Sequence, residues 1–250
     1  MTTVVIIPGS FAKPNLYVSL TKSLARHDIQ CEVVDLPSVG RREGKPPGTM
    51  ADDVNEIVAT TTKLLDQDKD VVFLTHSYGG VPGTQSLERL SRKARQAEGK
   101  KGGVGKIIYM AAVALPVGGS VLGLLTAPDF LKIDDDYMTL EPEGSAPFTF
   151  SDFPPEEALK LAKALPEQAT ASYRDELTYP GYEDAEVHYI VCEKDKLVLT
   201  EYQYGMVEFL RGVTKGEVGL HKLNSGHSPY LTQPDNVTKI VKEIIEKKQF

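Results

Sequence analysis

The chain has 250 residues, of which 41% are hydrophobic and 25% charged, values that are ordinary for a globular protein. Its net charge of −7 argues against nucleic-acid binding, which normally needs a basic face. The apolar start at Val4 lacks the preceding basic residues of a signal peptide, and no run reaches the roughly 18 apolar residues of a membrane span. The length fits one domain with a modest insertion.

The two cysteines, Cys31 and Cys192, form no metal-binding pattern and are interpreted as buried structural thiols. Together with the composition, they favour a cytoplasmic protein that has neither a nucleic-acid nor a membrane partner. The sequence leaves the oligomeric state open.

Short apolar runs alternate with longer amphipathic segments in the first half of the chain, a pattern typical of a parallel sheet covered by helices. Asn15 is the candidate N-cap of the first helix. In chain order, we expect a strand over 4–7, a helix over 16–26, a strand over 31–36, a Gly-, Pro- and Arg-rich loop over 37–48, a helix over 49–66, a strand over 71–75, a helix from about Gly79 and an exposed basic loop over 92–105.

The second half of the chain contains a break in this alternation between residues 116 and 184, where prolines and an acidic triplet at 134–136 surround one clear helix over about 155–165. The remaining predicted elements are strands over 106–111, 187–192 and 218–223 and a final amphipathic helix over 236–247. The prediction is therefore an α/β fold: a mostly parallel sheet of about six strands flanked by helices. Its core would comprise residues 1–115 and 185–250, with a small helical cap, or lid, over 116–184 inserted after the fourth strand.

The most informative motif is Thr75-His76-Ser77-Tyr78-Gly79-Gly80, which lies where a predicted strand ends and a helix begins. A sharp strand-to-helix turn exposes a serine hydroxyl and places it at a helix start, where free N–H groups favour developing negative charge. Ser77 is therefore the candidate nucleophile. Thr75 replaces the first glycine of the usual Gly-x-Ser-x-Gly pattern, and the alternative role for Ser77 is that of a simple helix cap.

A general base is expected on a loop after a late strand, and His227 follows the predicted sixth strand directly, between Gly226 and Ser228. The other histidines fit this role less well, because His188 and His221 lie within predicted strands and His27 ends a surface helix.

The third member of a triad is a carboxylate that holds the imidazole in the productive tautomer. Asp195 lies just past the fifth predicted strand, and Glu193 is a competitor at the same strand end. We favour Asp195. The segment after the fourth strand, 110–113, is apolar and offers no carboxylate.

An oxyanion hole needs two backbone N–H groups aimed at the tetrahedral oxygen. Tyr78, which follows the nucleophile, is the first expected donor. The loop after the first strand, Pro8-Gly9-Ser10-Phe11, is expected to supply the second through the N–H of Ser10. A tight turn that serves packing alone is the alternative interpretation of Pro8-Gly9.

With these residues in place, the chain resembles the small α/β-hydrolases that include plant methylesterases, hydroxynitrile lyases and bacterial carboxylesterases. The order Ser77, Asp195, His227 is the order of that superfamily. The resemblance runs nearly end to end outside the cap, although His-Gly is commoner in that group than Pro8-Gly9. It implies a short form of the α/β-hydrolase fold with a small cap over the pocket, and no metal or organic cofactor. The segments that carry it are 5–10, 35–40, 189–195 and 226–231, with Gln233-Pro234.

Within this group, the hydroxynitrile lyases that resemble the chain place a threonine and a lysine where this chain has Gly9 and Ser228. Cyanohydrin cleavage is therefore not expected. The sequence predicts a serine carboxylesterase-type hydrolase that cleaves a small carboxylic ester or lactone through a Ser77 acyl-enzyme. Two alternatives stay open: a biosynthetic enzyme of the same fold that performs acyl transfer, condensation or carbon–carbon cleavage, and a non-catalytic protein that binds a small ligand.

Large apolar residues in the predicted cap make an apolar acyl or aromatic group plausible for the substrate, and they are equally consistent with a core of the cap itself. They are Leu122, Leu124, Leu125, Phe130, Tyr137, Phe148 and Phe153.

Overall fold

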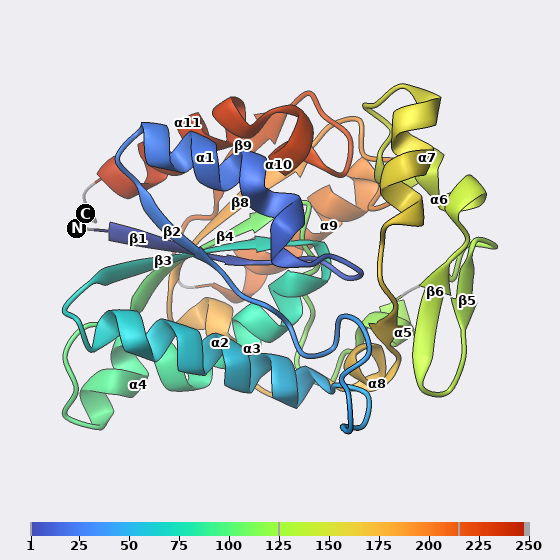
Figure 1. The fold of residues 1–250 in the computed structure, drawn as a ribbon. Coiled ribbons are helices and arrows are strands. Elements are labelled where there is room, and N and C mark those ends of the chain that lie inside the picture. The colour runs from blue at the N-terminus through green and yellow to red at the C-terminus, as the bar shows by residue number, and fades with distance from the viewer. Residues whose placement is uncertain (1, 125, 215, 248–250) are drawn as a thin grey trace.

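The computed structural model describes residues 2–124, 126–214 and 216–247 and contains a six-stranded sheet whose neighbouring strands are all parallel (Figure 1). The strand order is β2-β1-β3-β4-β8-β9, which confirms the predicted sheet. Its members are β1 (Thr2–Ile7), β2 (Gln30–Val33), β3 (Asp70–His76), β4 (Val104–Met110), β8 (Glu186–Cys192) and β9 (Gly219–Leu223).

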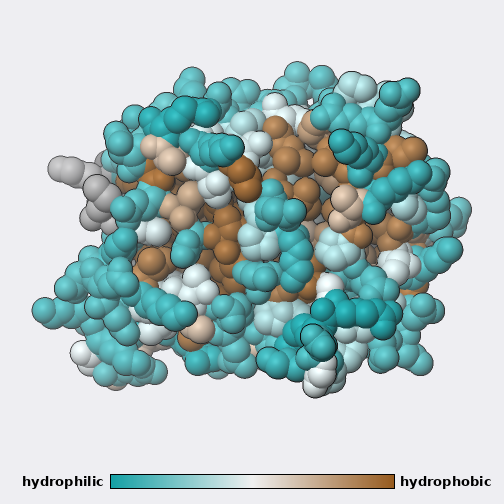
Figure 2. Space-filling view, in the orientation of Figure 1, coloured by the Kyte–Doolittle hydropathy of each residue, from teal (hydrophilic) through white to brown (hydrophobic). Residues whose placement is uncertain are grey.

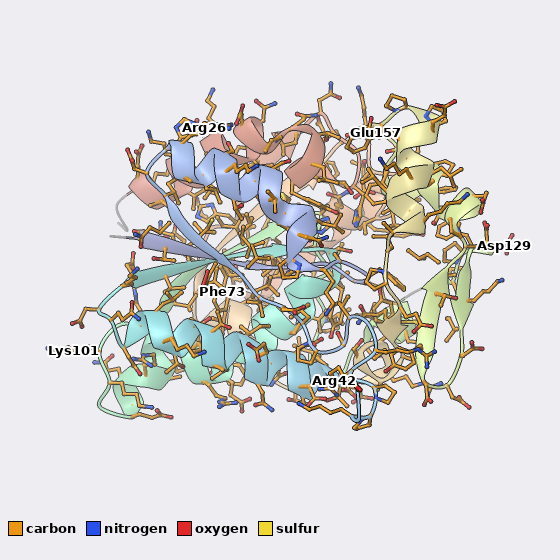
Figure 3. The ribbon with its side chains drawn as sticks, in the orientation of Figure 1. Arg26, Arg42, Phe73, Lys101, Asp129 and Glu157 are labelled. Carbon is orange, nitrogen blue, oxygen red and sulfur yellow. The ribbon has the colours of Figure 1, made fainter. Side chains whose placement is uncertain are left out.

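Helices cover both faces of the sheet, and alternate strand residues point into two separate cores. On β1, for example, Val5 and Ile7 join the cluster under α2 (Met50–Leu65) and α3 (Gly80–Leu90). Val4 and Ile6 join the cluster under the helices of the opposite face, α1 (Val18–Arg26) and α11 (Pro234–Glu246). This two-sided burial explains why the central strands are apolar throughout. Figure 3 shows Phe73 of β3 in the middle of the molecule, whereas the labelled charged residues lie around it.

The remaining helices differ from the prediction in several places. Asn15 is not a helix cap, because it lies in a 3-10 turn (Pro14–Tyr17) that precedes α1. The predicted basic loop contains α4 (Arg92–Ala97), where Arg95 is buried and pairs with Asp66 at 3.0 Å. A long helix, α9 (Thr200–Val213), lies where none was predicted.

Residues 116–184 contain more strand structure than the predicted helical cap. A small antiparallel sheet has the order β5-β6-β7 and stands beside the main sheet, at the right of Figure 1. Its strands have two to four residues each, too short to give an alternating pattern in the sequence. Leu125 lies outside the described residues. The elements are α5 (Val121–Leu124), β5 (Leu131–Ile133), β6 (Tyr137–Leu140), α6 (Pro142–Thr149), α7 (Pro155–Lys163), β7 (Gln168–Ala169), α8 (Ala171–Arg174) and a 3-10 turn (Gly181–Glu183).

The two cysteines are both free thiols, and only Cys192 is fully buried, so the prediction of two buried thiols holds for that residue alone. Burial raises the pKa of the half-buried Cys31 to about 11. Within the described ranges, every helix is too short or too polar to cross a lipid bilayer.

Candidate active site

Ser77 occupies a tight turn between β3 and α3, in the first position of a short 3-10 segment (Ser77–Gly79). Its φ of +50° is a left-handed conformation that is uncommon for a residue with a side chain. The turn packs closely against neighbouring backbone. A Cβ on Gly79 would lie 2.4 Å from the carbonyl oxygens of Ile7 and Pro8, and one on Gly80 would lie 2.3 Å from that of Val113. Glycine is therefore required on the helix side of this turn.

Thr75, the departure from the usual motif, is accommodated by a glycine elsewhere. Its hydroxyl donates to the Ile108 carbonyl of β4 at 3.1 Å, and the side chain is buried. A Cβ on Gly83 of α3 would lie 2.8 Å from the Thr75 methyl group. The added volume on the strand is therefore matched by a missing side chain on the facing helix.

His227 and Asp195 form a buried pair, with His227 Nδ1 at 2.8 Å from Asp195 Oδ2. A carboxylate only accepts hydrogen bonds, so Nδ1 carries the proton and Nε2 keeps its lone pair. The other oxygen, Oδ1, accepts from the backbone N–H groups of Leu197 and Val198 at 2.8 and 3.0 Å. The competitor Glu193 is exposed and lies 3.7 Å from Lys222.

Gln203, on the helix that the sequence analysis missed, is a further partner of this carboxylate. Its Nε2 donates to Asp195 Oδ2 at 3.3 Å and to the Val198 carbonyl at 2.7 Å. Its Oε1 accepts from the Cys192 N–H at 2.9 Å. A single buried glutamine in a helix carries no sequence signal for such a role.

His76, next to Ser77, joins the histidine loop to the loop after β1. Its Nε2 donates to the His227 carbonyl at 2.9 Å, so in the neutral ring Nδ1 accepts from the Tyr17 hydroxyl at 2.9 Å. Tyr17 in turn accepts from the Gly9 N–H at 3.0 Å. Burial, followed by the nearby His227, lowers the pKa of His76 well below its usual range. Both ring nitrogens are occupied, so His76 is not placed to act as a base.

The predicted triad is only partly joined by hydrogen bonds. Within the described residues, the Ser77 hydroxyl forms no hydrogen bond. His227 nevertheless lies near the serine turn, because its ring is 4.7 Å between centroids from that of His76, the residue before Ser77. Distances between a nucleophile and its base are often long in the unliganded state and shorten when substrate binds.

The loop after β1 leaves one backbone donor free. The N–H of Gly9 donates to Tyr17, and the N–H of Phe11 donates to Gln168 Oε1 at 3.1 Å. Between them, the N–H of Ser10 has no partner among the residues that the structure describes. A Cβ on Gly9 would lie 3.0 Å from the Ser77 Cβ, which places this loop directly against the candidate nucleophile.

Tyr78, the other predicted oxyanion donor, is anchored by a buried carboxylate that the sequence analysis did not identify. Its hydroxyl donates to Asp53 Oδ2 at 2.6 Å. Asp53 also accepts from the Ser38 N–H at 2.9 Å and the Ser38 hydroxyl at 2.6 Å. Burial raises the pKa of Asp53 to about 6, against the lowering effect of these hydrogen bonds.

We expect the free energy of unfolding of the Asp53→Asn variant, relative to that of the wild type, to be higher at pH 7.5 than at pH 5. Because the folded-state pKa of Asp53 is raised, its stabilising contribution is present below the unfolded value near 4 and is lost as pH rises through about 6. Because the unfolded carboxyl is already ionised at pH 5, the difference between pH 5 and pH 7.5 in the effect on the free energy of unfolding is about 1.4 kcal/mol. Urea unfolding of both proteins at the two pH values measures it.

The neighbouring Asp52 provides the matched contrast, since the hydrogen bond from the Thr49 N–H holds its pKa below the usual range. Its contribution is lost as pH falls, so Asp52→Asn should show the opposite trend. The same trend for both variants would contradict the assignment of Asp53.

The insertion also holds the loop on either side of His227. Asp152 Oδ2 accepts from the Gly226 N–H at 2.6 Å, and the Ser228 hydroxyl donates to the Thr149 carbonyl at 2.9 Å. Hydrophobic residues gather in Figure 2 over the region where Figure 1 shows α10 (Pro229–Thr232) and the cap helices. In one apolar cluster, Phe153 and Leu231 pack against the buried Phe150. A surface groove of about 580 Å³ beside Cys31 contains none of the predicted site residues.

The parallel sheet and the serine-bearing turn at the end of β3 define an α/β-hydrolase architecture. Residues 4–240 match the model of the alpha/beta hydrolase family, and the chain belongs to this family. The resemblance inferred from the sequence is thus confirmed.

Two similar proteins extend over almost the whole chain. A probable hydrolase of Phoma sp. (strain ATCC 20986 / MF5453) is 30% identical over 244 residues, which cover 96% of this chain and 97% of that protein. An alpha/beta hydrolase of Aspergillus novofumigatus (strain IBT 16806) is 25% identical over 96% of this chain and 94% of its own length. A methylesterase protein from Arabidopsis shares the fold, with a TM-score of 0.74, 19% identity and coverage of 98% of this chain and 99% of that one.

Proposed function

We propose that this protein is a serine hydrolase that cleaves a small, apolar carboxylic ester or lactone through an acyl-enzyme on Ser77. The observation that carries the proposal is the buried His227–Asp195 pair, at 2.8 Å, beside the strained turn of Ser77. Membership in a hydrolase family and the fold shared with a methylesterase support the same reaction class.

In this mechanism, Ser77 Oγ attacks the carbonyl carbon while its proton passes to His227 Nε2. The negative charge that develops on the carbonyl oxygen is stabilised by the N–H groups of Ser10 and Tyr78. Collapse of the tetrahedral intermediate breaks the ester bond, and the alcohol leaves with the proton from His227. Water then attacks the acyl-enzyme by the same steps, releasing the acid and restoring Ser77.

The apolar character of the proposed substrate rests on the surroundings of the site. Tyr173 and Phe150 from the insertion are buried, and Phe150 belongs to the apolar cluster that includes Leu231 of α10. Burial of an apolar acyl group here would contribute roughly 25 cal/mol per Å² of apolar surface removed from water.

A fluorophosphonate probe tests the proposal without a choice of substrate, because it reacts only with an activated serine. We expect one adduct by intact mass, located on Ser77 by peptide mapping and lost in the His227→Ala variant. Hydrolysis of p-nitrophenyl esters of increasing acyl length then measures the preference for apolar acyl groups.

Absence of an adduct on a folded sample would contradict the proposal and favour a ligand-binding protein of the same fold. An adduct on Ser77 with product formed only when an alcohol or amine acceptor is added would instead indicate acyl transfer.

A further inference from the structure

Gln168 is a fully buried residue of the insertion whose side chain bonds to three other segments. Its Oε1 accepts from the Phe11 N–H at 3.1 Å, in the loop after β1. Its Nε2 donates to the hydroxyls of Ser38 and Ser172 at 2.8 and 2.7 Å. A short contact between the Ser10 and Tyr173 hydroxyls adds a second bond from the insertion to the same loop.

We propose that Gln168 is a positioning residue for the oxyanion loop, through which the insertion sets the geometry of both oxyanion donors. The inference rests on the proposed function for its catalytic consequence. Gln168 touches neither the nucleophile nor, in the proposed mechanism, the substrate. It acts through the backbone that carries Ser10.

The position of Gln168 matters because the loop is not held by regular structure at this point. Phe11 has a φ of +58°, a left-handed conformation that is costly for an aromatic residue. Its N–H is buried and would be left without a partner if the Gln168 side chain were removed. Ser10 is the preceding residue. If the backbone rotated so that the Phe11 N–H found another partner, the Ser10 N–H would no longer point toward the proposed oxyanion position.

A second arm of the network leads from Gln168 to Tyr78. Gln168 Nε2 donates to the Ser38 hydroxyl, which donates to Asp53, and Asp53 accepts from the Tyr78 hydroxyl. The ring of Tyr78 also stacks on that of Tyr173 at 5.5 Å between centroids. The proposed donor Ser10 lies in the loop after β1, and the donor Tyr78 lies in the 3-10 turn after β3. This series of hydrogen bonds connects the two segments. We call it the oxyanion brace: Gln168, Ser38, Asp53 and Tyr78.

The test compares Gln168→Met with Gln85→Met. Gln85 is a matched control because it is also buried, and its Oε1 accepts from Thr178 and Tyr179 in the insertion without touching the oxyanion brace. We expect Gln168→Met to lower kcat for a p-nitrophenyl ester by about 10- to 100-fold, less than or comparable to the loss of one oxyanion donor, with KM changed less than about threefold. Affinity for a trifluoromethyl ketone, which mimics the tetrahedral intermediate, should fall by the same factor as kcat.

Amide hydrogen exchange of Phe11 supplies a readout that does not depend on activity. We expect its protection to fall about tenfold or more in Gln168→Met and to stay unchanged in Gln85→Met. If the wild-type protein hydrolyses no ester, the proposed function fails, and this exchange still decides whether Gln168 holds the loop.

Unchanged kcat and unchanged Phe11 protection in Gln168→Met would overturn the proposal. An equal loss of kcat in Gln85→Met would also overturn it, because the effect would then follow from a weakened insertion. Should Gln168→Met fail to fold, Ser38→Ala breaks the arm toward Tyr78 with a smaller change, and a kcat loss with unchanged KM is again required.

Discussion

Replacing Ser77 with alanine is expected to reduce ester turnover by about 10⁴-fold or more, because no other group in the proposed mechanism can form the acyl-enzyme. The fold should be unaffected. Alanine keeps the Cβ that the turn already accommodates at a φ of +50°, and the Ser77 hydroxyl forms no hydrogen bond with the described residues that would be lost. Initial rates with a p-nitrophenyl ester, measured together with the thermal midpoint, check both parts.

Ser228→Ala is the control for this prediction, since Ser228 is a buried serine next to His227 that the mechanism does not use as a nucleophile. Its hydroxyl bonds to the Thr149 carbonyl, so a loss of activity below about tenfold is expected from a slight shift of the histidine loop. Turnover retained in Ser77→Ala would reject the acyl-enzyme. If a fluorophosphonate still modified the Ser77→Ala variant, the reactive nucleophile would be a different residue.

The main sheet was predictable because its strands are buried on both faces and leave uninterrupted apolar runs such as 71–75. The segments that follow the strands were predictable for a related reason. The carboxyl ends of parallel strands meet at one edge of a sheet, so residues just past β3 and β8 can meet there. The Asp195–His227 contact follows from this rule together with the position of His227 after β9.

The residues that hold the site in place were not predictable in the same way. Asp53 and Gln168 lie 25 and 157 residues along the chain from Tyr78 and Phe11, and Gln203 lies on a helix that was not predicted. None of the three residues belongs to a motif. Their roles depend on tertiary packing, which brings a helix or a short strand against a loop. Thr75 shows the same limit, because only the position of Gly83 in the fold explains how a threonine fits the serine turn.

Two histidines meet beside Ser77, and hydrogen bonding gives them opposite roles. His76 has both nitrogens engaged, with Tyr17 and with the His227 carbonyl, so it links two loops as a neutral ring. Among the residues that the structure describes, only Nδ1 of the His227 ring has a hydrogen-bond partner, and Nε2 is left to accept a proton. His76 therefore binds the backbone of the candidate base, while the side chain of His227 stays free to act on Ser77.

Asp195→Asn is expected to lower kcat by about 10³- to 10⁴-fold while preserving the fold. The reason lies in the donors around the carboxylate. Leu197 and Val198 direct two N–H groups at the Oδ1 position, so the oxygen of an asparagine is held there. Its NH₂ group then faces His227 and donates to Nδ1, which forces the ring proton onto Nε2. The imidazole would then have no lone pair directed toward Ser77.

Glu193→Gln is the matched control for this prediction, because Glu193 follows the same strand but is exposed and paired only loosely with Lys222. We expect its kcat to stay within about twofold of the wild type, as surface ion pairs contribute little. The pH–rate profile adds a second check, since the Asp195→Asn variant should recover part of its rate when hydroxide replaces His227 as the base. A large loss in Glu193→Gln together with a small loss in Asp195→Asn would reverse the assignment of the acid.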